Sequence, residues 1–235
     1  MNTHYTYFII LGASLVGPLG LSFDKKVAFY KNWKYLFPAM LLPALFYIVW
    51  DIFFTSKGIW SFNEEYISGI KIINLPLEEV LFFFIVPYCC VFIYECIHVY
   101  FPQVNNKRVG DIVLKLLAVV LLIVGIIFYD KWYTSCTFIL NAVFITAIYL
   151  TRKHFNMFDA TLFLVAYLVM LIPFLIVNGF LTSIPVVIYN NAENVGIRIS
   201  TIPLEDTFYG MLLILMNIVI YEKLKSNHNG IWKSS

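Results

Sequence analysis

Residues 74–95 read NLPLEEVLFFFIVPYCCVFIYE, in which two adjacent carboxylates stand at the start of a long apolar run. No charged side chain occurs from Val80 to Tyr94. A continuous apolar segment of about 20 residues is long enough for a helix to cross a bilayer. The stretch is therefore predicted to be a membrane span, with Glu78 and Glu79 at its mouth.

The rest of the chain has the same character. Of its 235 residues 61% are apolar and 13% are charged, and the mean hydropathy is +0.82, well above that of soluble domains. Long continuous apolar runs favour helices over the strands of a membrane barrel, which alternate in polarity over about 10 residues. The expected fold is an all-α integral membrane protein with seven transmembrane helices. They are expected at about 4–22, 35–54, 77–100, 112–129, 132–150, 159–180 and 203–222.

The sequence contains an internal repeat. Residues 69–79 (GIKIINLPLEE) align without gaps to residues 196–206 (GIRISTIPLED), with six identities in eleven at an offset of 127. The tripeptide IYE at the end of the third span, residues 93–95, recurs at 220–222 at the same offset. Spans one to three therefore correspond to spans five to seven in a parallel 3+1+3 repeat. The predicted units are a first three-helix repeat (1–101), a connector helix (102–131), and a second three-helix repeat with a cytoplasmic tail (132–235).

The basic residues predict the orientation in the membrane. Counted on alternate sides of the seven spans, twelve Lys and Arg fall on one side and four on the other. Cytoplasmic loops carry the excess of positive charge, so the N-terminus is expected outside the cell inner membrane and the C-terminus in the cytoplasm. Loops 55–75 and 181–202 then lie on the outer side, where they are long enough to fold over the bundle. The net charge of +2 gives no reason to expect a nucleic-acid partner.

The two PLE(E/D) motifs suggest chemistry. Proline and carboxylates suit the first turn of a helix, so a single motif is adequately explained as a cap. Two motifs related by the repeat would instead bring four carboxyl groups toward one cavity between the halves. Carboxyl groups packed together at low dielectric cannot all be ionised, which leaves an acid beside a base. Because acids inside a membrane are functional candidates, the candidate catalytic residues are Glu78, Glu79, Glu205 and Asp206.

Aromatic side chains surround these motifs in the sequence. Most aromatic residues of membrane helices face lipid or the core, but ring faces also stabilise a cation, by about 2 kcal/mol or more when water is excluded. The candidate substrate-binding residues are Trp50, Phe82, Phe83, Phe208 and Tyr209.

The remaining acidic residues of the spans, the cysteines and the histidines are expected to have structural rather than chemical roles. Glu95 and Glu222 lie 17 residues beyond Glu78 and Glu205, about 25 Å along a helix, and are expected to snorkel at the opposite interface. The four cysteines lack paired CxxC spacing and the four histidines are scattered, so no metal site is expected.

Three segments carry a resemblance to a known family. PLEEVLFFFIVPYCCVFIYE, its second copy PLEDTFYGMLLILMNIVIYE, and SFDKKVAFYKNWKYLFPA (residues 22–39) resemble the membrane lycopene cyclase domain of carotenoid biosynthesis. The similarity is to the form in which two three-span halves are fused in one chain. It implies that Pro76 and Pro203 belong to the motif together with the four carboxylates. Since the second motif ends in Asp206 rather than Glu, the proton donor among the four is left open.

The resemblance also implies a reaction. The family closes the linear ends of lycopene into ionone rings, here expected to be β-rings that give β-carotene via γ-carotene, by proton-initiated carbocation cyclisation without net redox. No cofactor is expected, because Gly12, Gly17 and Gly20 lie in an apolar helix and form no dinucleotide fingerprint. The expected partners are lycopene or a related linear carotenoid, the lipid bilayer and other carotenoid-pathway enzymes.

A transporter is the alternative function, since parallel 3+1+3 repeats also build small carriers. Such a carrier would place prolines or polar groups at matching depths near the middle of corresponding spans. Pro43 and Pro173 lie in spans two and six but do not align at the offset of 127. The duplicated carboxylates therefore favour the cyclase.

Overall fold

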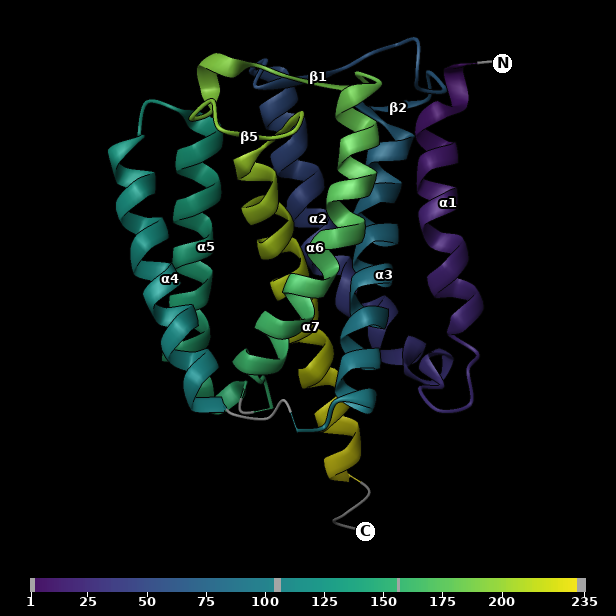
Figure 1. Ribbon diagram of the computed structural model, residues 1–235, viewed down its shortest axis with the longest axis vertical. Coiled ribbons are helices and arrows are strands. Elements are labelled where there is room, and N and C mark those ends of the chain that lie inside the picture. Colours follow the sequence, from purple (N-terminus) through teal and green to yellow (C-terminus); the bar gives the residue numbers. More distant parts are fainter. Residues whose placement is uncertain (1–2, 104–106, 156, 232–235) are drawn as a thin grey trace.

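The computed structural model describes residues 3–103, 107–155 and 157–231, and its architecture is a bundle of seven long helices (Figure 1). All seven are long and apolar enough to cross a membrane. The predicted fold class is confirmed. The helices are α1 (Thr6–Leu21), α2 (Trp33–Ser56), α3 (Leu77–Tyr100), α4 (Lys107–Ile127), α5 (Trp132–Leu150), α6 (Ala160–Ser183) and α7 (Leu204–Ile231).

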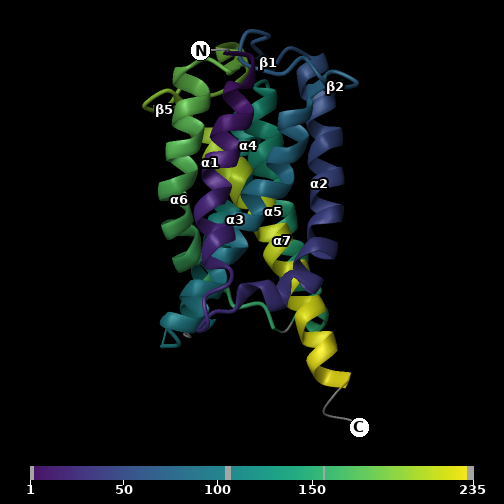
Figure 2. The same cartoon turned by 90° about the vertical axis from the view of Figure 1, so that its right-hand side faces the viewer.

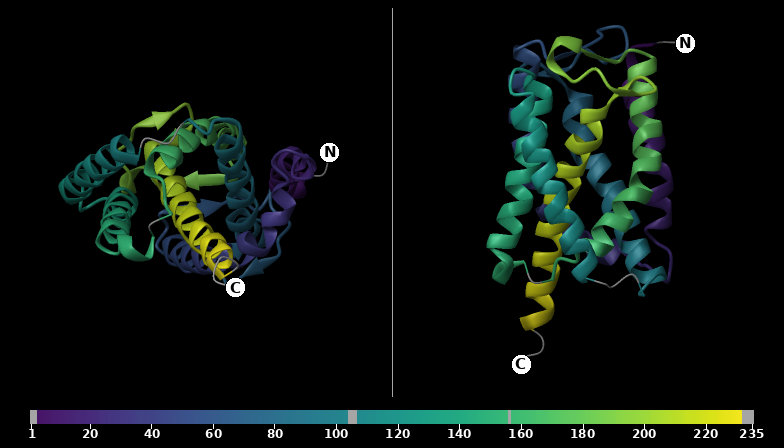
Figure 3. Two further views of the ribbon diagram at one scale, coloured as in Figure 1. Left: turned by 90° about the horizontal axis from the view of Figure 1, so that it is seen from below. Right: turned by 60° about the vertical axis from the view of Figure 1, so that its left-hand side comes forward.

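The helices follow the expected 3+1+3 arrangement. Both α3 and α7 begin at the end of the bundle that carries the strands, and the chain leaves α7 at the other end (Figures 1 and 2). The connector α4 packs beside α5 at one edge, and α1 lies at the opposite edge, whereas α7 crosses the middle of the bundle (Figure 3). The two motif-bearing helices are thereby the most enclosed of the seven.

A small hairpin precedes each motif-bearing helix. β2 (Lys71–Ile72) pairs with β3 (Leu75–Pro76), and β5 (Arg198–Ile199) pairs with β6 (Ile202–Pro203). The tight turns place Ile73 at φ 62° and Ser200 at φ 58°, the same left-handed conformation 127 residues apart. The repeat seen in the sequence is therefore also a repeat of backbone geometry.

The two halves are joined by a strand ladder over the bundle. β1 (Trp60–Phe62) pairs antiparallel with β4 (Val187–Tyr189), and Ser61 faces Ile188 at the centre. These strands occupy equivalent positions in the two repeats, so the ladder is symmetric about its central pair. The backbone N–H groups of Asn63 and Asn190 extend it on both sides, donating to the carbonyls of Val186 and Ile59 at 2.9 Å.

The predicted outer loops do fold over the bundle. Ile59, Trp60 and Ile67 of the first loop are buried. The short strands were not expected from the sequence, and those of the described residues are two or three residues long and lie in these loops. They close the strand-bearing end of the space between α3 and α7.

Candidate active site

The motifs start their helices as the sequence predicts. Pro76 directly precedes α3 with φ −58°, and Pro203 directly precedes α7. A proline fits this place because its φ is preset and its missing N–H would have no helical partner. The carboxylates that follow lie in the first helical turn, where the helix dipole favours negative charge, and all four are buried.

The first carboxylate of each motif holds the loop of its own half. Glu78 Oε1 accepts a hydrogen bond from the backbone N–H of Ser68 at 2.7 Å. Glu205 Oε1 accepts one from the N–H of Val195 at 2.9 Å and another from the Thr134 hydroxyl at 2.5 Å. Ser68 and Val195 are 127 residues apart, so the contact is repeated. Neither Glu78 nor Glu205 lines the cavity between the halves.

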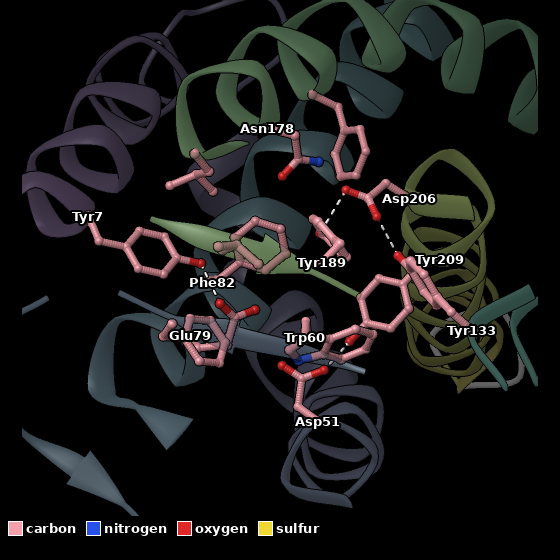
Figure 4. A pocket seen from close by; sticks show the side chains of 14 residues that line it. Tyr7, Asp51, Trp60, Glu79, Phe82, Tyr133, Asn178, Tyr189, Asp206 and Tyr209 are labelled. Carbon is pink, nitrogen blue, oxygen red and sulfur yellow. Dashed lines mark hydrogen bonds between the residues drawn. The ribbon is translucent and has the colours of Figure 1, made fainter. Parts of the chain in front are cut away.

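The second carboxylate of each motif faces a shared cavity. Glu79 and Asp206 both line a cavity of about 40 Å³ between the halves (Figure 4). Glu79 Oε2 accepts a hydrogen bond from the Tyr7 hydroxyl at 2.6 Å. Asp206 accepts from the hydroxyls of Tyr133 and Tyr189, one on each oxygen. The structure thus brings together one carboxylate from each motif.

A third carboxyl group, Asp51 of α2, joins them in the cavity lining. Its side chain is buried, lies within hydrogen-bonding reach of Glu79, and accepts a hydrogen bond from the Tyr209 hydroxyl at 2.6 Å. A hydrogen bond between two carboxyl groups requires a proton on one of them, since a carboxylate has no donor. The Asp51–Glu79 pair is therefore suited to carrying a proton.

Asp51 was missed by the sequence analysis, although a signal was present. It is the one charged residue between Trp33 and Ser56 apart from Lys34, and its equivalent at the offset of 127 is Asn178. Asn178 lies on α6 and lines the same cavity. Searching the repeat for matched polar residues within spans would have found this pair.

The tyrosines that donate to Glu79 and Asp206 were also missed. Tyr7 belongs to α1 and Tyr133 to α5, and they are not equivalent in the repeat because Tyr7 corresponds to Thr134. Tyr189 lies on β4, outside the membrane-spanning helices. Burial raises the pKa of Tyr189 well above its ordinary value, and the nearby Asp206 charge adds to the effect. Its hydroxyl therefore stays protonated and donates.

Of the five aromatic residues expected to bind substrate, two line the cavity, one packs behind them and two lie elsewhere in the core. Phe82 and Tyr209 line the cavity, together with Trp60 of the loop. Trp50 stands behind them with its ring 5.1 Å from that of Tyr209, centre to centre. The remaining two pack elsewhere in the core, Phe83 against Tyr47 at 5.5 Å and Phe208 against Phe138 at 4.9 Å.

Glu95 and Glu222 do not snorkel, so that expectation is wrong. Both are buried between helices at the other end of the bundle. Glu95 Oε1 accepts hydrogen bonds from the Tyr221 hydroxyl at 2.7 Å and from Lys225 Nζ at 2.5 Å. Tyr94 lies beside Glu222 in the matching arrangement. The crossing of α3 and α7 covers these carboxylates, and they form a tie between the halves about 25 Å from the cavity.

Comparison with known proteins identifies the family. The model of the lycopene cyclase family matches residues 3–97 and 130–224, two stretches that begin 127 residues apart. The lycopene beta-cyclase of Halobacterium salinarum is 36% identical over 61 residues, which are 23% of this chain and 26% of that protein. The bifunctional lycopene cyclase/phytoene synthase of Phycomyces blakesleeanus is 26% identical over 88 residues, 34% of this chain and 15% of the fungal protein.

These alignments span about a quarter or less of the relatives' own length. No solved structure matches the chain. The two family matches, in contrast, cover both repeats and most of the 235 residues. The chain therefore belongs to the lycopene cyclase family.

Proposed function

We propose that this protein is a lycopene β-cyclase, which closes the linear ends of lycopene into β-rings and gives β-carotene via γ-carotene. The observation that carries the proposal is the convergence of Asp51, Glu79 and Asp206 in one buried, aromatic-lined cavity between the halves. Membership of the lycopene cyclase family and the lycopene cyclase activity in the relatives' names support the choice of a linear carotenoid as substrate.

The reaction needs a proton donor and a proton acceptor. Protonation of the terminal double bond creates a tertiary carbocation, the neighbouring double bond attacks it to close a six-membered ring, and loss of a ring proton restores neutrality. Atoms and electrons balance without an oxidant or reductant, so no redox cofactor is required. A protonated carboxyl group is the donor that this first step requires.

We assign the donor to the Asp51–Glu79 pair. Two carboxyl groups within hydrogen-bonding reach hold a shared proton, and the Tyr7 and Tyr209 hydroxyls orient the pair from opposite sides. Asp206 is assigned as the base, because hydrogen bonds from two tyrosines on its two oxygens suit a carboxylate. Asp206 takes up the proton that the ring loses, and this proton must pass from Asp206 back to the Asp51–Glu79 pair before the next ring closure, which restores the starting state of the enzyme.

The aromatic lining stabilises the intermediate cation. Trp60, Phe82 and Tyr209 surround the carboxyl groups, and Trp50 supports Tyr209 from behind. Ring faces attract positive charge most strongly where water is excluded. The strand ladder over the cavity serves this exclusion by holding Trp60 in place.

Glu78 and Glu205 receive a different role from the one that the motif alone suggests. Each accepts the N–H of its own loop, and neither lines the cavity. We propose that they are positioning residues, which fix the loops and the first turns of α3 and α7, while Pro76 and Pro203 set where those turns begin.

We extend the proposal to the organisation of the chain. Residues 1–101 and 132–235 form the two catalytic halves, and 102–131 connect them. The end of the expected cytoplasmic tail, 232–235, lies outside the described residues. The N-terminus faces outward from the cell inner membrane. Cysteines introduced in 55–75 or 181–202 should react with an impermeant label from the periplasm, and labelling only from the cytoplasm would reverse the orientation.

Expression in cells that accumulate lycopene tests the function. We expect the wild-type chain to produce β-carotene, identified by chromatography. Glu79→Gln and Asp206→Asn should slow the conversion by about tenfold to ten-thousandfold, as for a lost general acid or base. Glu78→Gln and Glu205→Gln should be milder, because a carboxamide oxygen still accepts the loop N–H. Unchanged lycopene, with the wild-type chain confirmed in the membrane, would contradict the function and favour transport.

A further inference from the structure

An apolar groove lies next to the cavity, between α1, α3 and α6. Its volume is about 490 Å³, and its walls are almost entirely hydrocarbon, including Ile10, Ala13, Val86, Ile93 and Val177. Of its polar groups, the Ser14 hydroxyl is satisfied by the carbonyl of Leu11 at 2.7 Å, and Cys89 Sγ contacts the carbonyl of Ser14 at 3.6 Å. A ligand in this groove would find apolar side chains and few groups to hydrogen-bond.

The groove adjoins the cavity and is lined by three of the same helices. Phe174 of α6 lines both spaces. On α3 the cavity residue Phe82 is followed one turn later by Val86 in the groove, and the groove extends to Ile93. From Glu79 to Ile93 is about 21 Å of helix at 1.5 Å per residue. The groove therefore leads from the carboxyl groups deep into the span.

Part of the groove opens to lipid. Ile9, Ile176 and Phe180 line it and are more than half exposed on the surface of the bundle. They belong to α1 and α6, so the opening lies between these two helices. An apolar molecule dissolved in the bilayer could enter there without crossing water.

Equivalent positions in the other half are filled by aromatic rings. Pro173, Phe174 and Val177 of the groove correspond by the repeat to Phe46, Tyr47 and Trp50. The Tyr47 ring packs 4.8 Å from that of Tyr209, and the Trp50 ring packs 5.1 Å from it. The Tyr47 hydroxyl also donates to the carbonyl of Tyr209 at 2.8 Å. The helices that form the groove thus have equivalents in the other half, but aromatic side chains fill the equivalent positions there.

We propose that the groove binds the long polyene chain of a linear carotenoid while one end of the molecule occupies the cavity. The inference rests on the proposed function. A cavity of about 40 Å³ is far too small for the polyene chain, so most of the substrate must lie in an adjoining apolar space. The groove adjoins the cavity at Phe174, is lined by hydrocarbon and opens to the bilayer. The one-ringed product then leaves and binds again in reverse for the second closure.

Filling the groove tests this assignment. Ala13→Trp blocks it from α1, and Val177→Trp blocks it from α6 with the residue that the other half carries at the same place. The matched controls Val16→Trp and Ile172→Trp add the same side chain to exposed positions of the same helices outside the groove. Excluding the polyene should lower conversion of lycopene by about tenfold or more in the groove variants, and the controls should stay within about twofold of wild type.

Binding is measured separately from turnover. Each tryptophan is introduced into the inactive Glu79→Gln/Asp206→Asn chain, which is purified from lycopene-accumulating cells. Retained lycopene is quantified by absorbance, and retained phospholipid by mass spectrometry. We expect lycopene with the inactive parent and with the Ile172→Trp control, and about tenfold less with Val177→Trp. Ala13→Leu, a smaller filling, should lower retention in the same direction if the tryptophan variants do not reach the membrane.

Three outcomes would overturn the assignment. Groove variants that cyclise lycopene as well as the controls would show that the polyene lies elsewhere. Equal lycopene retention by the parent and the filled variants would do the same, and phospholipid retained in place of lycopene would identify the groove as a lipid site. In all three cases the wild-type chain still makes cyclic product, whereas a wild-type chain that leaves lycopene unchanged contradicts the proposed function itself.

Discussion

At the scale of single residues, the site departs from the symmetry of the repeat where proton chemistry is required. Asp51 and Asn178 occupy equivalent positions on α2 and α6, and both line the cavity. A carboxyl group holds a proton that it can release, whereas an amide does not. In the proposed mechanism the first half would therefore supply the acid, and the second half would supply a neutral polar group of similar size.

Asp51→Asn tests this division of labour. The amide keeps the size of the side chain and an oxygen that accepts from Tyr209, but it removes the exchangeable proton. We expect lycopene conversion to fall by about a hundredfold to ten-thousandfold at normal membrane levels. Glu64→Gln, a change at an exposed carboxylate, is the matched control and should leave conversion unchanged. Full activity in Asp51→Asn would remove this residue from the donor pair.

The sequence predicted the motif carboxylates but not their hydrogen-bond donors. Glu79 and Asp206 could be found because each sits in a motif that recurs at a fixed offset. Tyr7 and Tyr133 lie about 70 residues from their partners in unremarkable apolar context. Only the packing of α1 against α3, and of α5 against α7, brings these hydroxyls to the carboxylates.

At the scale of secondary-structure elements, the helices and their repeat were predictable because both signals are local. Apolar length gives each span, and a fixed offset gives the correspondence between halves. The β1–β4 ladder was not predictable, since three-residue strands carry too little pattern to specify a partner 127 residues away. Tertiary packing of the loops decides that pairing.

The hydrogen bonds that Tyr221 and Lys225 of α7 donate to Glu95 of α3 are expected to contribute to stability rather than to catalysis. Glu95→Leu removes the acceptor for Tyr221 and Lys225 at the end of the bundle far from the cavity. We expect a loss of about 1–3 kcal/mol in stability, because buried donors lose their partner. A lower thermal midpoint in detergent would report it. Glu64→Gln breaks the exposed Glu64–Lys71 pair and should have little effect. Similar midpoints for the two variants would contradict a stabilising role for the tie.

The connector helix predicts a second stability effect. A Cβ on Gly110 of α4 would lie 2.2 Å from the backbone nitrogen of Thr161 and 2.6 Å from the carbonyl carbon of Ala160. Backbone atoms cannot move aside cheaply, so Gly110→Ala should destabilise the protein by about 1–3 kcal/mol. Gly12→Ala meets nothing within 4 Å and gains helix propensity, so it should be neutral or slightly stabilising. Thermal melts of both variants decide whether α4 docks this closely.

At the scale of the whole molecule, the two halves share their backbone arrangement but differ in residues of the proposed site. The paired hairpins and the loop contacts of Glu78 and Glu205 are repeated nearly unchanged, and the single β1–β4 ladder takes one strand from each half. Asp51 against Asn178, and Trp50 against Val177, differ at equivalent positions. Residues that line the cavity and the groove thus differ between two halves whose backbones are alike.

This arrangement predicts one shared site for both ring closures. Lycopene has two ends and the chain has two motifs, so a separate site for each end is the simple alternative. The cavity, however, takes Glu79 from one half and Asp206 from the other, and three helices are too few to enclose a cation without the opposite half. Glu79→Gln and Asp206→Asn should therefore each slow the first and the second closure together, and lycopene should remain the main pigment.

Two independent sites would give a different pigment pattern. Each variant would then lose one closure only, and a one-ringed product would dominate in both. A single slowed site also accumulates some one-ringed intermediate, because the second closure follows the first on the same carboxyl groups. The pigments must therefore be followed by chromatography until their ratio stops changing. A one-ringed product that persists as the end point in both variants would rule out the shared site, whereas an intermediate that rises and is then consumed supports it.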